Sequence, residues 1–199
     1  MSAFEFVFSL FGLLLGFSLV EVLGKLAASV KARPQIRTGW LTPLLSLFVL
    51  LDVTSFWSIV WDARDAIPAT YGVLVVGLAI TGLYYFAASL IFPSDLDAAC
   101  DLNRWYFDHK STVIAILLAC QFLAHGSRYA VMGTTAYQWS LIGWIQVSIY
   151  LAALAAAIFA RGFRWNVTLL ALMIAVCLVD GIRHLLPVNG MEAAEQQTS

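Results

Sequence analysis

The sequence predicts an all-α fold, a polytopic bundle of six transmembrane helices. Of its 199 residues, 61% are apolar and only 12% are charged, whereas average proteins are about 45–50% apolar and about 25% charged. The apolar residues form six long runs that contain few charges, and the connections between these runs are short. Such an excess of apolar residues excludes a soluble globular protein and a disordered chain.

Each run is long enough to cross a bilayer, because a hydrocarbon core needs about 20 apolar residues in a helix. The first span is interrupted only by Glu5, Glu21 and Lys25, the second contains Asp52 alone, and the third contains no charge. The fourth and sixth spans end in polar residues, and the fifth is uncharged and rich in alanine. In chain order the predicted spans are 4–30, 40–61, 71–92, 113–131, 139–160 and 165–186.

The chain forms one predicted domain, residues 1–187, followed by a flexible polar tail, residues 188–199. Its largest connection is 93–110, where Pro93 ends the third span. Ser94 and Asp97 have the spacing of a capping box. This connection therefore predicts a short helix that lies in the membrane interface and leads into the fourth span.

The basic residues set the expected orientation, since lysine and arginine are retained on the cytoplasmic side of a membrane. Three of them belong to one side, namely Arg64, Arg128 and Arg183. The other eight belong to the opposite side, namely Lys25, Lys31, Arg33, Arg37, Arg104, Lys110, Arg161 and Arg164. Both termini are therefore expected to face outward, which in a bacterium is the periplasm.

The segment 84–110 contains the strings Tyr-Tyr-Phe-Ala-Ala, Ile-Phe-Pro-Ser-Asp and Asn-Arg-Trp-Tyr-Phe-Asp-His-Lys. It resembles an uncharacterised group of small bacterial multi-span proteins. The resemblance implies a six-helix protein of the bacterial inner membrane and brings no activity with it.

Ionisable residues inside the spans are the candidate functional groups, because each costs at least about 2.5–3.5 kcal/mol in a bilayer. At 1.5 Å per residue from the cytoplasmic end, Asp52 lies about 20 Å along its span, and His125 and Asp180 lie about 22 Å along theirs. By the same measure Arg128, Arg183 and His184 lie near 27 Å, close to the outer boundary. The polar groups therefore gather in the outer half of the bundle.

Helical spacing groups these residues into stripes. Gln121, His125 and Arg128 share one face of the fourth span, and Asp180 shares a face of the sixth span with Arg183 and His184. Asp52 has no cation on its own helix, so we expect its partner to be Arg128 or His125. The second, fourth and sixth spans would then meet around a small polar chamber open to the outside.

A structural interpretation competes with this one. Arg128, Arg183 and His184 could extend to the outer headgroups, and Asp180 with Arg183 could form an ion pair within one helix. Asp52 and Asp180 lie too deep to reach the headgroups, so these two carboxylates are the stronger functional candidates.

The leading functional prediction is an ion or small-solute channel or transporter, with Asp52 and Asp180 as titrating or coordinating groups and no bound cofactor. A non-catalytic accessory or assembly subunit is the main alternative. Two others are less favoured. One is a metal-dependent membrane hydrolase, with zinc on His125, Asp52 and Asp180 and with His184 nearby; the other is a redox protein with haem between His125 and His184.

The expected partners are the lipid bilayer and a second copy of the chain. Ser9, Gly12 and Gly16 form a stripe of small residues on the first span, which allows close approach of another helix. The stripe packs either within one protomer or against a second copy. A net charge of −1 provides no basic surface for nucleic acid.

Overall fold

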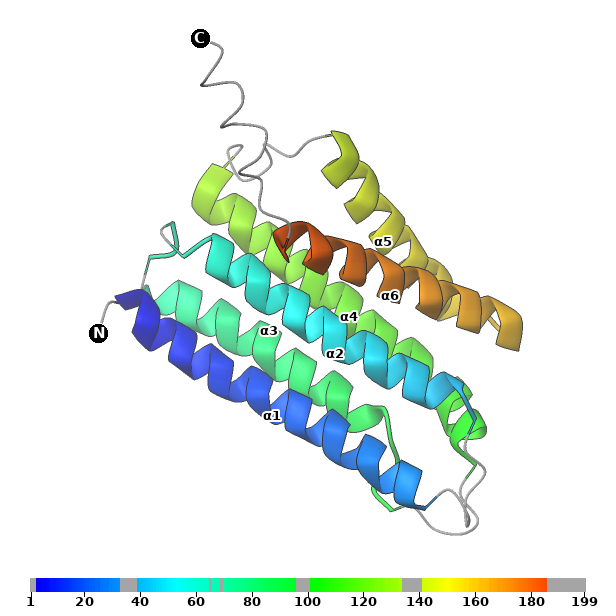
Figure 1. Cartoon of the computed structure of the whole chain (residues 1–199). Helices are drawn as coiled ribbons and strands as arrows, with labels where there is room; N and C mark the ends of the chain where they lie inside the picture. Colours follow the sequence, from blue (N-terminus) through cyan, green and yellow to red (C-terminus); the bar gives the residue numbers. More distant parts are fainter. Residues whose placement is uncertain are drawn as a thin grey trace.

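A computed structural model of the chain describes residues 3–32, 39–64, 66–68, 70–95, 101–133 and 141–185. Within these ranges the side chains of residues 3, 4, 6, 7, 62, 132, 141, 142 and 183–185 are not described. The described residues confirm the all-α class, since they form helices and no strand. The helices are α1 (Ala3–Lys31), α2 (Leu41–Asp62), α3 (Tyr71–Leu90), α4 (Leu102–Met132), α5 (Leu141–Phe159) and α6 (Phe163–Leu185) (Figure 1).

Five of these helices are long and apolar enough to cross a membrane: α1, α2, α3, α4 and α6. The part of α5 whose side chains are described, Gly143–Phe159, is an apolar helix of shorter length. Large apolar side chains also cover the outside of the bundle, as Leu13, Phe17 and Val20 do on α1. This distribution suits a protein surrounded by lipid.

Consecutive helices run antiparallel, so the start of α1 and the end of α6 lie at the same end of the bundle (Figure 1). We call the end of the bundle at which α1 begins the N-terminal end, and we call the other end of the bundle the opposite end. The first four helices form a ring in which α1 contacts α2 and α3, and α4 contacts the same two helices. Outside this ring α6 packs on α2, and α5 packs on both α4 and α6.

Local sequence explains where several helices begin and end. Asp101 caps α4, because its side chain accepts hydrogen bonds from the backbone N–H groups of Asn103 and Arg104. Gly133 follows α4 with a φ of 59°, a backbone conformation that suits glycine. Pro93 follows the end of α3, where its ring cannot continue a helix.

The short interfacial helix expected between the third and fourth spans is not confirmed. Residues 102–110 form the first turns of α4, so this helix begins well before Val113, the start of the predicted span. The Asp101 cap provides the physical reason, because it satisfies the first N–H groups of the longer helix. Residues 96–100, including Asp97 of the expected capping box, lie outside the described residues, as does the tail, residues 188–199.

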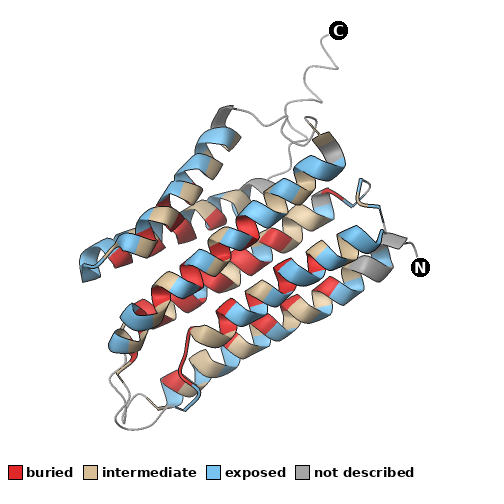
Figure 2. Ribbon diagram, turned by 180° about the vertical axis from the view of Figure 1, so that it is seen from behind, coloured by how far each residue is buried: buried red, intermediate tan, exposed pale blue. Residues whose placement is uncertain are grey.

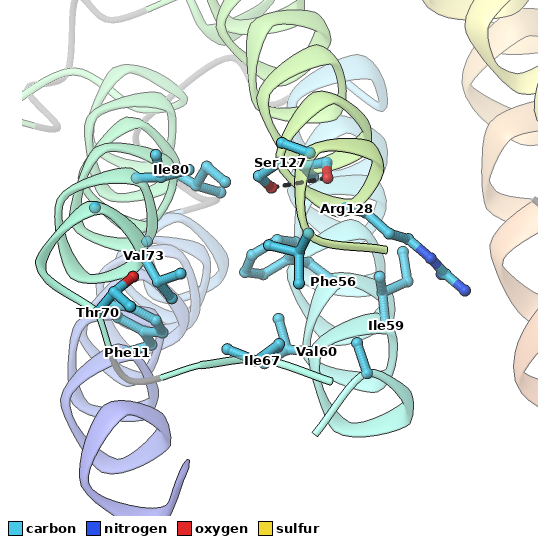
Figure 3. A pocket seen from close by; sticks show the side chains of 17 residues that line it. Phe11, Phe56, Ile59, Val60, Ile67, Thr70, Val73, Ile80, Ser127 and Arg128 are labelled. Carbon is cyan, nitrogen blue, oxygen red and sulfur yellow. Dashed lines mark hydrogen bonds between the residues drawn. The ribbon is translucent and has the colours of Figure 1, made fainter. Parts of the chain in front are cut away.

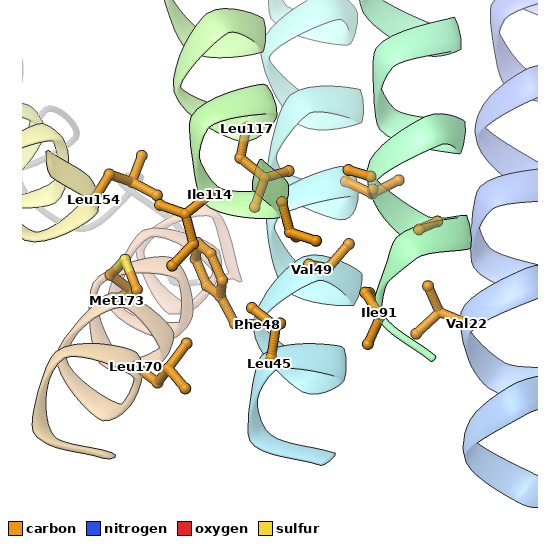
Figure 4. Close-up of a cluster of buried hydrophobic side chains, with 14 of the residues drawn as sticks. Val22, Leu45, Phe48, Val49, Ile91, Ile114, Leu117, Leu154, Leu170 and Met173 are labelled. Atoms are coloured by element: carbon orange, nitrogen blue, oxygen red, sulfur yellow. The ribbon is translucent and has the colours of Figure 1, made fainter. Parts of the chain in front are cut away.

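One continuous apolar core joins all six helices (Figure 4). Phe48 of α2 lies at its centre and is fully buried. Buried residues line the facing sides of the helices, and exposed residues cover the outside (Figure 2). The labelled members of the core are Val22, Leu45, Phe48, Val49, Ile91, Ile114, Leu117, Leu154, Leu170 and Met173.

The small-residue stripe of α1 divides between two environments. A Cβ atom added to Gly12 would lie 2.7 Å from Cη2 of Trp57, so this glycine allows α1 and α2 to pack closely within the protomer. A Cβ atom added to Gly16 would meet nothing within 4 Å. The Gly12 position is therefore used inside the molecule, and the contact of the first span with a second copy stays a prediction.

Candidate functional site

Asp52 is the centre of a buried polar cluster. Its residue is only 1% exposed, and its carboxylate accepts hydrogen bonds from three other helices. The Tyr84 hydroxyl donates to Oδ2 at 3.1 Å, and the Gln121 amide Nε2 donates to Oδ1 at 3.0 Å. The Tyr150 hydroxyl also donates to Oδ1. We call these four residues the Asp52 cluster.

Tyr84 and Tyr150 belong to the apolar core, and aromatic packing holds the cluster in place. The Tyr84 ring lies against Phe56, with centroids 5.5 Å apart, and the Tyr150 ring lies against Phe48 at 6.2 Å. Tyr84 and Tyr150 are themselves buried. Both rings are therefore fixed by apolar contacts while their hydroxyl groups point at one carboxylate.

This geometry accommodates Asp52 in two protonation states. As a carboxylate, Asp52 accepts all three hydrogen bonds. As a carboxylic acid it needs an acceptor for its own proton, and a tyrosine hydroxyl can turn to accept because it both donates and accepts. A proton on Oδ2 can thus be donated to the Tyr84 oxygen, while Gln121 and Tyr150 keep their hydrogen bonds to Oδ1.

The expected partners of Asp52 were wrong. Its hydrogen bonds come from Tyr84, Gln121 and Tyr150, not from His125 or Arg128. The reason is helical position. Gln121 shares a face of α4 with His125 but lies one turn deeper, within reach of the carboxylate. The Arg128 side chain points away from the cavity (Figure 3).

Asp180 belongs to a second, shallower pair. Its Oδ1 accepts a hydrogen bond from Nε2 of Gln146 at 3.3 Å, and both residues are half-buried. Gln146 lies one helical turn from Tyr150 on α5, toward the N-terminal end, as His125 lies one turn from Gln121 on α4. Polar side chains therefore continue from the Asp52 cluster toward this end, with burial that decreases along the way.

The expected chamber between the second, fourth and sixth spans stays a prediction, and the hydrogen bonds of its two carboxylates involve α5 as well. Asp52 of α2 is bonded to α3, α4 and α5, and Asp180 of α6 is bonded to α5. Because α5 packs between α4 and α6, it contributes side chains to both sites. The side chains of Arg183 and His184 lie outside the described residues, so their predicted roles stay predictions.

The described residues contain no group of three or more histidine, cysteine, aspartate or glutamate side chains that could hold a metal ion. His125, Asp52 and Asp180 therefore do not come together as the zinc ligands considered from the sequence. The haem alternative depends on His184, whose side chain is not described.

A second buried cluster joins α4, α5 and α6 at the opposite end. Lys110 is 4% exposed, and its Nζ donates to the carbonyl oxygen of Ala157 at 2.7 Å and to that of Ala160. These carbonyl groups belong to the C-terminal turn of α5, where the helix dipole favours a cation. Ser111 adds a hydrogen bond to the carbonyl of Ile158 at 3.1 Å.

Asn166 of α6 completes this second cluster. Its Oδ1 accepts from the Tyr106 hydroxyl at 2.9 Å, and its Nδ2 donates to the carbonyl oxygens of Ala160 and Gly162 at 3.1 and 2.8 Å. The two carbonyl groups lie at the turn between α5 and α6, and Tyr106 belongs to α4. The cluster therefore holds the helices together, and we assign it a structural role.

An apolar cavity of about 360 Å³ lies among α1, α2, α3 and α4 in the N-terminal half of the bundle (Figure 3). Three of its lining residues are each one helical turn from the Asp52 cluster: Phe56 follows Asp52, Ile80 precedes Tyr84, and Ala124 follows Gln121. This apolar layer separates the cavity from the buried carboxylate.

Sequence reasoning missed Tyr84, Tyr150, Gln146 and the Lys110 cluster. A usable signal existed for Tyr150, because a tyrosine in the middle of a span needs a partner for its hydroxyl group. Tyr84 and Tyr85 are adjacent, so only the packing decides that Tyr84 faces inward while Tyr85 is 45% exposed.

Comparisons of the chain with protein-family models, with curated proteins and with solved structures find no match.

Proposed function

We propose that the protein is an integral membrane transporter that moves protons, alone or with a small solute, and that Asp52 is the group that takes up the proton. One observation carries the proposal: a deeply buried carboxylate is bonded only to neutral donors, two of which are tyrosine hydroxyl groups. An ionisable residue so deep in a membrane protein costs stability, so it is expected to serve a purpose.

The shallower polar groups provide the approach to Asp52 in this proposal. Asp180, Gln146 and His125 lie one turn closer to the N-terminal end and are less buried than the Asp52 cluster. Protons would therefore enter from this end. Release of the proton at the opposite end requires the helices to move, since apolar core residues pack between Asp52 and that end.

We infer that all six helices cross a bacterial inner membrane, with the N-terminal end in the periplasm. This orientation rests on the division of the basic residues predicted from the sequence, eight on the cytoplasmic side and three on the outer side. An alkaline phosphatase domain fused to the C-terminus should be active in cells, and a green fluorescent protein fused there should be dark. The reverse result would contradict the orientation.

The transport proposal is tested by proton flux in proteoliposomes with a pH-sensitive dye inside. Asp52→Asn should abolish the flux, because asparagine keeps most of the hydrogen bonds but cannot take up a proton. Glu21→Gln is the matched control, since it removes a half-buried carboxylate on α1 that lies outside the proposed path, and it should retain flux. Both variants must first elute as folded protein in size-exclusion chromatography.

The same variants separate the proposal from its main alternative. An accessory or assembly subunit is favoured by the apolar core, because most of the described buried residues between Asp52 and the opposite end are apolar. If the wild type shows no more flux than empty liposomes, the transport proposal fails. Infrared difference spectra between acidic and alkaline buffer add an independent test, because a protonated carboxyl band that is missing from Asp52→Asn identifies the proton site directly.

A further inference from the structure

The apolar cavity among α1–α4 has the shape of a narrow channel parallel to the helices. Three helices each line the cavity along about two turns of one face. The first and last lining residues are Phe56 and Ala63 for α2, Gly72 and Ile80 for α3, and Ala124 and Val131 for α4. The two α3 residues are about 12 Å apart at 1.5 Å per residue.

These dimensions fit one hydrocarbon chain. A volume of about 360 Å³ over that length leaves a section about 6 Å across. Because carbon atoms in contact lie about 3.5–4.0 Å apart, such a section is wide enough for the carbon atoms of an acyl chain.

The lining excludes water and charged solutes as occupants. Its polar side chains are Thr70, Ser127 and Arg128, and the Ser127 hydroxyl already donates to the carbonyl oxygen of Ala124 at 2.9 Å. The guanidinium group of Arg128 points away from the cavity, so only the stem of this side chain lines it (Figure 3). A buried water needs two to four polar partners, and large apolar cavities stay dry or bind apolar molecules.

The cavity has an opening on the outside of the bundle. Gly72 of α3, and Ala130 and Val131 of α4, line the cavity and are themselves exposed. Phe56 and Ile80 at the inner limit are 6% and 3% exposed. An apolar molecule can therefore enter between the outer turns of α3 and α4, where a membrane protein meets lipid.

We propose that this cavity binds one acyl chain of a membrane phospholipid, which enters between the N-terminal turns of α3 and the C-terminal turns of α4. The surrounding bilayer supplies the occupant, and the apolar walls, the narrow section and the exposed opening match its chemistry. The bound chain fills space that would otherwise be an empty cavity in the bundle. Chain binding does not depend on proton transport.

The test uses phosphatidylcholine with a diazirine near the end of one acyl chain, reconstituted with the full-length protein. After illumination, mass spectrometry locates the labelled residues. Label on the buried residues Phe56 and Ile80 is expected, because lipid outside the bundle cannot reach them. Ala124→Phe should reduce this label at least tenfold, since its ring fills the cavity, while label on the exposed face of α1 stays unchanged.

Leu123→Phe is the matched control, because Leu123 is the preceding residue on α4 and is 40% exposed to the outside. This variant should keep wild-type label at Phe56 and Ile80. Label confined to exposed residues in the wild type would overturn the proposal. Equal label of the buried residues in Ala124→Phe would also overturn it, as would a different apolar molecule found in the cavity by native mass spectrometry. Proton flux is measured on the same variants, so that failure of one proposal is distinguished from failure of the other.

Discussion

Replacing Lys110 by methionine should weaken the attachment of α5 to α4. Methionine keeps an unbranched apolar stem but removes the ammonium group, which donates to the carbonyl oxygens of Ala157 and Ala160. Ala157 then loses its side-chain donor, whereas Ala160 keeps the bond from Asn166.

The size of the effect follows from these contacts. A hydrogen bond from a charged group contributes about 1.5–3 kcal/mol, and a cation at a helix C-terminus adds about 0.3–1 kcal/mol. Removing the buried charge also removes its desolvation cost, which offsets part of the loss. We therefore expect the free energy of unfolding to fall by about 3 kcal/mol for Lys110→Met.

The measurement is equilibrium unfolding in mixed detergent micelles with increasing SDS. Cys120 and Cys177 are buried, so their reaction with a thiol-specific fluorophore reports unfolding once Cys100 has been replaced by serine. Arg161→Met is the matched control, because Arg161 is exposed and lies in the connection that follows α5. Equal stability of the Lys110→Met and Arg161→Met variants would refute the structural role assigned to Lys110.

Three further predictions concern packing and can be checked by the same unfolding measurement. Gly77→Ala should lower stability by about 1–3 kcal/mol through overpacking, because its Cβ would lie 1.9 Å from Cζ of Phe11. The additional change Phe11→Ala should remove that clash, and a purely additive double variant would contradict the contact. Tyr106→Phe should cost about 1 kcal/mol by removing the bond to Asn166, and no loss would argue against this bond. Gly16→Ala should leave stability unchanged or raise it by up to about 1 kcal/mol, whereas a loss accompanied by dimer dissociation would reveal a second copy at this position.

The sequence by itself determined the class of this protein and the approximate limits of its helices. Long apolar runs can satisfy their backbone polar groups in lipid only by forming helices, so composition and run length are sufficient evidence. The same reasoning identified Asp52, because one charge in an apolar span is conspicuous without any knowledge of the fold. Its depth also followed from the fixed rise per residue of a helix.

The partners of Asp52 were decided only by the tertiary structure. Sequence reasoning paired unlike charges and so proposed His125 or Arg128, whereas the structure satisfies the carboxylate with neutral donors from Tyr84, Gln121 and Tyr150. Which residues meet depends on the rotation of each helix and on its neighbours, and helical periodicity fixes neither. A one-turn difference along α4 is enough to replace His125 with Gln121.

The start of α4 and the cavity were also missed from the sequence, for two different reasons. The cap at Asp101 sets the start of α4, although its first turns are polar and look like a connection in the sequence. The cavity exists because the faces of α1, α2, α3 and α4 do not fill the space between them at the N-terminal end. Periodicity predicts which residues share a face of one helix, but the space that remains between helices is a property of their packing.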